Sequence, residues 1–208
     1  MSDTWAIIQA RMGSTRLRGK VMMDIAGKPM LHHVIERTLD ATAHVIVATT
    51  YEPQDDAIAD ASKHYPVRVF RGSPIDVLSR YIAAAREVEA TRIVRITADC
   101  PMLDPDVVRR VIDACTLDVD YASNLYPRTY PKGLDCECFW FDTLLRLDRI
   151  SASHEREHVT AAIGRCPQLF RLANVHGNYL LPNWSVDTAE DLDRVRKLHE
   201  ALQPMRTP

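Results

Sequence analysis

Short apolar runs alternate with amphipathic segments along most of the chain. Runs rich in β-branched residues predict buried strands at 5–8, 44–49, 67–70 and 93–97. Apolar residues at helical spacing predict a helix opened by Pro29, helices at 54–65 and 76–88, one begun by Pro105, and two near 155–165 and 189–202. This alternation is typical of an α/β, Rossmann-like fold, with a mostly parallel sheet and helices on both faces.

Residues 120–141 interrupt this rhythm and are rich in Pro, Tyr and Asn. They predict irregular strands and loops laid over the carboxyl edge of the sheet, above the active site, and they are a candidate contact of a homodimer. The sequence contains no internal repeat, low-complexity tract or clear interdomain linker. We therefore expect one domain over residues 1–208.

Composition narrows the function mainly by exclusion. A formal charge of −2 gives no general electrostatic attraction to nucleic acid. Without a long apolar run or a basic leader, neither a membrane span nor a signal peptide is expected. The five cysteines are scattered and odd in number, which is typical of a reducing, cytoplasmic compartment.

A basic loop containing glycines follows the first predicted strand. Its cations are Arg11, Arg16, Arg18 and Lys20, and its glycines are Gly13 and Gly19. Loops at this edge bind ligands in open α/β sheets, where cations neutralise phosphates and glycines let backbone amides approach. Five residues separate the glycines and Val21 follows Lys20, so the loop is not a P-loop. A solvated basic turn is the alternative interpretation.

This loop and several later segments resemble one enzyme family. The matching segments are 8–20, 25–30, 69–73, 76–78, 95–101, 130–135, 155–160 and 185–192. Together they are similar to the cytidylyltransferases that make CMP-activated acidic sugars, in particular the spore-coat polysaccharide branch, related to the CMP-KDO and CMP-sialic acid synthetases. Arg18 departs from the Pro usual in that family. The resemblance implies a fold of the nucleotide-diphospho-sugar transferase type and CTP as the nucleotide.

The resemblance also implies roles for individual residues. Nucleotide-binding positions are Ala10, Arg11, Met12, Gly13, Ser14, Lys20, Arg71 and Asp99, and catalytic positions are Arg11, Arg16, Lys20 and Asp99. Asp99 and Asp187 match the metal positions, and Mg²⁺ favours a few carboxylate oxygens together with substrate phosphates. The alternatives are a turn residue at Asp99, a helix N-cap at Asp187 and a surface arginine at Arg71.

The acceptor side is less well defined. Asp135 and Glu137 alternate with two cysteines in a predicted strand, and we expect them to be exposed to an acceptor pocket. Arg156 and His158 are candidates to meet an acidic substrate. The segment 154–158 also satisfies the HExxH zinc motif. However, Ala161 stands where the extended motif has Gly and no third histidine follows, which favours the acceptor-side interpretation.

The sequence therefore predicts an Mg²⁺-dependent cytidylyltransferase. It would transfer CMP from CTP to an acidic sugar or related small acceptor, release pyrophosphate, and serve surface polysaccharide synthesis. One alternative is a nucleotidylyltransferase acting on a phosphorylated non-sugar acceptor. Another is a nucleotide-sugar-dependent glycosyltransferase, for which an Asp-x-Asp motif would be expected in place of residues 97–99. A non-enzymatic nucleotide-binding module would not need two separated carboxylates.

Overall fold

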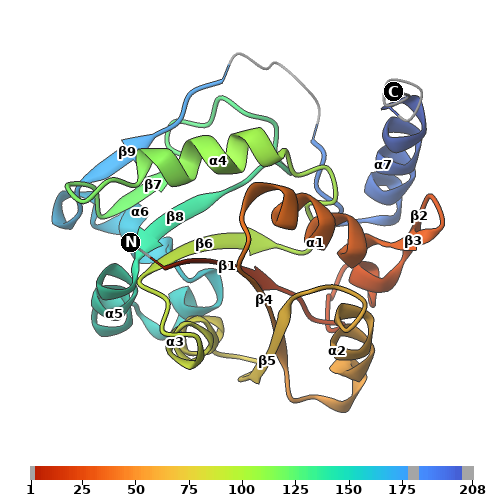
Figure 1. Ribbon diagram of the computed structural model, residues 1–208, viewed down its shortest axis with the longest axis horizontal. Coiled ribbons are helices and arrows are strands. Elements are labelled where there is room, and N and C mark those ends of the chain that lie inside the picture. The colour runs from red at the N-terminus through yellow and green to blue at the C-terminus, as the bar shows by residue number, and fades with distance from the viewer. Residues whose placement is uncertain (1–2, 178–182, 203–208) are drawn as a thin grey trace.

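The computed structural model describes residues 3–177 and 183–202. Within these residues a seven-stranded sheet has the order β5-β4-β1-β6-β8-β7-β9 (Figure 1). Its strands are β1 (Thr4–Gln9), β4 (Val45–Thr50), β5 (Arg68–Gly72), β6 (Arg92–Thr97), β7 (Tyr121–Ser123), β8 (Glu137–Trp140) and β9 (Leu172–Asn174). The first four of these confirm the predicted strands within one or two residues.

The sheet is mostly parallel, as predicted. Strands β1, β4, β5 and β6 pair in parallel, and β7 pairs in parallel with β9. Strand β8 runs antiparallel to both β6 and β7. The reason is topological, because the segment 124–136 joins β7 to β8 without the crossover helix that parallel neighbours require.

Helices cover both faces of the sheet. They are α1 (Met30–Ala41), α2 (Asp56–Ser62), α3 (Val77–Glu87), α4 (Pro105–Ala114), α5 (Phe141–Ile150), α6 (Ala161–Arg165) and α7 (Ala189–Leu202). In β1, Ala6 and Ile8 pack in one apolar cluster with α1 and α4, whereas Ile7 packs in a second cluster with α3 and α5 (Figure 1). Successive residues face opposite sides of a strand, so both sides of β1 must be apolar.

Smaller elements complete the described chain. A short hairpin of β2 (Asp24–Ile25) and β3 (Lys28–Pro29) precedes α1, and 3₁₀ helices occupy Lys20–Met22, Pro53–Asp55, Ser153–His158 and Pro167–Leu169. Among the residues that the structure describes, no helix is both long enough and apolar enough to cross a membrane.

One prediction about local structure is wrong, and a second is wrong only for the strands that it placed over the sheet. The predicted helix at 155–165 is split into a 3₁₀ helix and α6 by Val159, whose φ is 55°. Side-chain bonds fix this break, since Glu155 accepts from the Ala152 N–H and Thr160 donates to a carboxylate of the sheet. In the segment 120–141, β7 and β8 are members of the sheet itself rather than strands laid over it, and α5 directly follows β8. The loop 124–136 between these strands carries Lys132 to the carboxyl edge of the sheet.

Candidate active site

A cavity of about 430 Å³ lies at the carboxyl ends of β1 and β6. Its charged lining comprises five cations, Arg11, Arg16, Lys20, Arg95 and Lys132, and three carboxylates, Asp99, Glu157 and Asp187. Ala10, Ser14, Thr97 and His158 also line it. The excess of positive charge suits an anionic ligand such as a polyphosphate.

Hydrogen bonds within the basic loop bring Lys20 into this cavity. The N–H groups of Ser14 and Gly19 both donate to the Met12 carbonyl at 2.9 Å, so the loop folds back on itself. Gly19 has a φ of 69°, a conformation that favours glycine, and the 3₁₀ helix beginning at Lys20 follows it. The Met12 N–H donates to buried Asp55 at 2.8 Å, which anchors the loop to the segment after β4.

Asp99 and Asp187 converge on the Lys20 ammonium. The Lys20 Nζ lies 2.9 Å from a carboxylate oxygen of each aspartate and 2.7 Å from the Val186 carbonyl. Burial would lower the pKa of Lys20, but the two carboxylates outweigh it and raise that pKa. The structure therefore brings together two carboxylates that are 88 residues apart in sequence.

Asp187 is the most heavily paired carboxylate of the cavity. Besides Lys20, it accepts from Lys132 at 3.0 Å and pairs with Arg16 at 3.0 Å. Burial would raise its pKa, but the hydrogen bonds and charges of Lys20 and Lys132 lower the pKa to about 2. Asp187 is thus ionised throughout the physiological range.

The two aspartates fit a divalent cation. Their oxygens already share one positive group, and Mg²⁺ binds through one or two carboxylates plus substrate phosphates rather than through an all-protein cage.

Zinc at the 154–158 segment has less support. That motif needs an α-helix to place its histidines on one face, whereas residues 153–158 form a 3₁₀ helix.

A glycine contact positions Lys132 beside Asp187. The Trp184 N–H donates to the Lys132 carbonyl at 2.6 Å. The neighbouring Gly133 has a φ of 104°, and a Cβ on it would lie 2.4 Å from the Trp184 carbonyl carbon. Only glycine allows this close approach of two backbone segments.

Most of the predicted basic and acidic residues meet in the cavity. Ala10, Arg11, Ser14, Arg16, Lys20, Asp99, His158 and Asp187 line it. Met12, Gly13, Arg71, Asp135, Glu137 and Arg156 do not. Of this second group, Met12 and Gly13 are residues of the basic loop, and the side chains of the remaining four form hydrogen bonds or ion pairs with other residues.

Three of these four side chains are exposed or half-buried and pair with an opposite charge outside the cavity. Arg71 donates to Asp56 and to two carbonyls of residues 50–52. Arg156 binds Asp76 at 2.7 Å and Asp148 at 2.8 Å. Asp135 makes a two-fold contact with Arg128 at 2.6 and 2.9 Å. The structure does not bring them into the cavity in this state.

The expectation that Glu137 is exposed is wrong. Its side chain is 3% exposed and forms an ion pair with Arg95 of the neighbouring strand. Tyr121 and Thr160 donate to its other oxygen at 2.7 and 2.6 Å. Alternation does separate Glu137 from the cysteines, but the face opposite them is covered by α3, α5 and the 153–160 segment.

Three charged residues of the cavity were not among the predicted site residues. Lys132 stands between Pro131 and Gly133, and Glu157 lies inside the segment that we tested for zinc. Arg95 carried the clearest available signal, because it is the one charged residue within the apolar run 93–96. A charge inside a buried strand requires a partner or a function.

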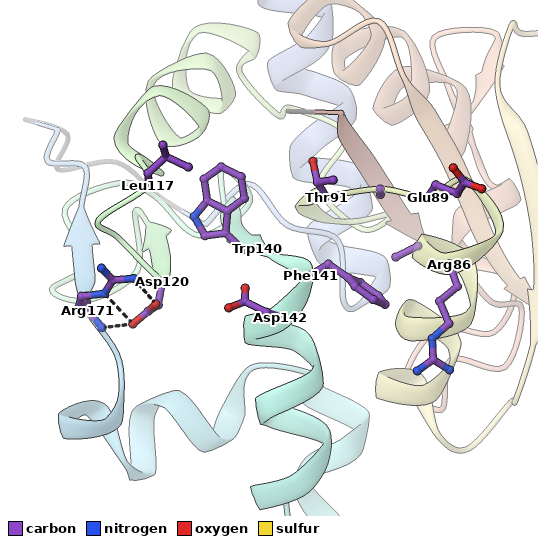
Figure 2. Close-up of a pocket in the computed structure, with 11 residues that line it drawn as sticks. Arg86, Glu89, Thr91, Leu117, Asp120, Trp140, Phe141, Asp142 and Arg171 are labelled. Atoms are coloured by element: carbon purple, nitrogen blue, oxygen red, sulfur yellow. Dashed lines mark hydrogen bonds and ion pairs between the residues drawn. The ribbon is translucent and has the colours of Figure 1, made fainter. Parts of the chain in front are cut away.

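A second, more apolar cavity of about 610 Å³ lies at the opposite edge of the sheet (Figure 2). Trp140, Phe141 and Leu117 contribute most of its apolar wall. Its buried carboxylate, Asp120, is bonded to Arg171 at 2.7 and 2.8 Å. This cavity is larger, but its lining has two arginines against three carboxylates and so offers no excess of positive charge to a phosphate, which makes the carboxyl-edge cavity the candidate active site.

The fold and the carboxyl-edge cavity define an α/β protein of the nucleotidyltransferase type. The chain belongs to the cytidylyltransferase family, which it matches over residues 5–207, and it is therefore a nucleotidyltransferase enzyme. This membership confirms the resemblance found in the sequence.

Individual relatives agree with this assignment. The spore coat polysaccharide biosynthesis protein SpsF of Bacillus subtilis is 30% identical over 213 residues, covering 96% of this chain and 88% of SpsF. A cytidylyltransferase structure from Leptospira borgpetersenii is 29% identical with a TM-score of 0.91, covering 99% and 95% of the two chains. CMP:2-keto-3-deoxy-manno-octonic acid synthetase, solved in complex with CTP, shares the fold at 22% identity and a TM-score of 0.73, covering 96% and 99%.

Proposed function

We propose that this enzyme transfers CMP from CTP to an acidic sugar or a related small acceptor, releases pyrophosphate, and requires Mg²⁺. One observation carries the proposal: Arg11, Arg16 and Lys20 meet Asp99 and Asp187 in a single cavity. Several cations beside two carboxylates form the set of groups that a metal–nucleoside triphosphate needs. Family membership supports cytidine as the base.

The basic loop would bind the triphosphate. In the structure Arg11 pairs with Glu157 at 2.5 Å, and Lys20 and Arg16 pair with Asp187. Phosphate oxygens would replace these carboxylates, because each cation lines the cavity and has donors to share. Ser14 adds a hydroxyl donor at the same wall.

The reaction is an attack by an acceptor oxygen on the α-phosphorus. The bond from that phosphorus to the bridging oxygen breaks, pyrophosphate leaves, and the acceptor hydroxyl loses its proton. Asp99 and Asp187 would hold Mg²⁺, which when bound neutralises charge on the phosphates. Arg11, Arg16 and Lys20 would stabilise the negative charge that gathers on the departing pyrophosphate.

Several further elements of the function rest on the same proposal. The SpsF relative favours a role in surface polysaccharide synthesis. The five free cysteines favour the cytoplasm. Exposed Tyr126 supports residues 120–141 as a homodimer contact. The predicted acceptor residues are Asp135, Arg156 and His158. Arg156 would bind the acceptor only after it releases its carboxylate partners, and Asp135 only after it releases its arginine partner.

A pyrophosphate-release screen tests the proposal. The four nucleoside triphosphates are each combined with acidic sugars and with phosphorylated non-sugar acceptors, with Mg²⁺ and then with EDTA. We expect release only with CTP, an acidic sugar and Mg²⁺. Pyrophosphate release only with phosphorylated non-sugar acceptors would favour a nucleotidylyltransferase for that class of acceptor. Tight CTP binding without pyrophosphate release for any combination of nucleotide and acceptor would favour a non-enzymatic binding module.

A further inference from the structure

The ion pair formed by Arg95 and Glu137 is buried beside the active-site cavity, and neither residue belongs to the proposed triphosphate or metal site. Arg95 lines the cavity from β6, and its side chain is 15% exposed. Glu137 stands directly beside it in the register of β6 and β8, and is almost completely buried. A buried ion pair is rarely retained for stability alone, since apolar residues of similar volume stabilise a core equally well.

The hydrogen bonds of this pair are distributed unevenly. Glu137 is fully engaged, because Arg95, Tyr121 and Thr160 all donate to it. Arg95 contacts it through Nη1, while its Nε is buried and has no partner within the described residues. Buried donors without partners are rare in folded proteins and frequently mark functional sites. A ligand would therefore meet the guanidinium through the exposed part of the side chain that lines the cavity, and not through the buried Nε.

The position of Arg95 in the sheet separates it from the triphosphate site. The basic loop follows β1, and Asp99 follows β6, so the proposed metal–phosphate centre lies above the ends of these two strands. Arg95 is four residues before Asp99, on the face of β6 that the 153–160 segment covers. Arg95 and His158 both line the cavity, and β6, which carries Arg95, lies between β1 and β8 in the sheet, away from β4 and β5.

We propose that Arg95 binds the carboxylate of an acidic sugar acceptor and that Glu137 is a positioning residue for it. The inference rests on the proposed function and specifies its acceptor class. A guanidinium offers a planar pair of donors that matches a carboxylate. Glu137 holds Nη1 toward β8 and so orients the exposed part of the guanidinium that lines the cavity. Thr160 also donates to Glu137, and this bond holds the segment that carries His158 against β8.

The test is an equilibrium binding experiment by calorimetry on the full chain with Mg²⁺ and the non-transferable analogue cytidine 5′-(α,β-methylene)triphosphate. The probes are 3-deoxy-manno-octulosonate, N-acetylneuraminate, the methyl ester of the latter and glucose 1-phosphate. We expect at least one of the two free acids to bind the wild-type protein, and the methyl ester not to bind.

The variants separate ligand binding from folding. Arg95→Lys keeps the charge but not the planar pair of donors, and Arg95→Gln/Glu137→Gln removes both charges together so that neither is left buried alone. Each should weaken binding of the acid about 10- to 100-fold, the range for losing a hydrogen bond to a charged group. The affinity for the CTP analogue should stay unchanged. Asp120→Asn/Arg171→Gln removes an ion pair with a similarly buried carboxylate beside the distal cavity, and should affect neither affinity.

The remaining outcomes overturn the inference. Equal binding of the acid to wild type and to both Arg95 variants would remove Arg95 from the acceptor site. Binding of glucose 1-phosphate alone, or of no probe at all, would exclude a carboxylate site while leaving CTP transfer intact. Failure of the wild type to bind the CTP analogue would overturn the proposed function itself, and this inference with it.

Discussion

Replacing Asp187 by asparagine separates its contribution to stability from its proposed function. Its side chain is 9% exposed, accepts hydrogen bonds from Lys20 and Lys132, and forms an ion pair with Arg16. The two lysines lower its pKa from an ordinary value of 3.8 to about 2. That difference corresponds to about 2 kcal/mol of unfolding free energy. Screening by water in the adjoining cavity reduces the expected loss in Asp187→Asn to roughly 1–2 kcal/mol.

The pH dependence of this loss has a defined sign. A carboxylate whose pKa is lowered by folding stabilises the protein above its ordinary pKa, and this contribution disappears as pH falls through the folded value. Urea unfolding should therefore show the full difference between wild type and Asp187→Asn at pH 7. The difference should shrink as the pH is lowered from about 4 toward 2.

Turnover with CTP distinguishes Asp187 from a carboxylate that is only structural. Asp120 is also 9% exposed and has a pKa of about 2, set mainly by its hydrogen bonds to Arg171, but it lies at the distal cavity. Asp120→Asn should cost a comparable unfolding free energy and leave pyrophosphate release unchanged. Asp187→Asn should lower release about 100-fold or more, because a bound metal supplies several kcal/mol at a phosphoryl centre. Equal activities of the two variants would refute a metal role for Asp187.

Three further changes probe the loop and the backbone around the site. Lys20→Ala should slow pyrophosphate release at least 10-fold, whereas Arg18→Ala, outside the cavity, should change the same rate less than two-fold. Gly133→Ala should lower unfolding free energy by more than about 2 kcal/mol, since its Cβ would overlap backbone, and Gly27→Ala, with a similar φ but open space, by only about 1. Glu157→Gln should lower the KM for CTP several-fold by freeing a cation, and an unchanged or higher KM would contradict our account of that ion pair.

The sequence by itself determined the layers of the fold. Four apolar, β-branched runs alternate with amphipathic segments, and burial on both faces of a parallel sheet explains both patterns. The basic loop could also be located, because any loop that follows the first strand of such a sheet lies at its ligand-binding edge. Asp99 was found for the same reason, at the end of another parallel strand.

Tertiary structure decided which side chains share the cavity. Asp187 lies in a segment outside the parallel strands, so strand pattern does not predict that it is close to Asp99. Family resemblance implied the pairing, and in the structure both aspartates accept a hydrogen bond from Lys20. Local pattern also failed at Val159, where Thr160 bonds to a strand distant in sequence and breaks the predicted helix.

Glu137 and Arg95 illustrate the physical reason. Alternation assigns each of them to a face of a strand, but whether that face meets water, a helix or a cavity depends on elements far away in the chain. The faces of strands and helices are local properties that sequence spacing encodes. The burial and pairing of a charged side chain depend on long-range packing, which only the folded chain defines.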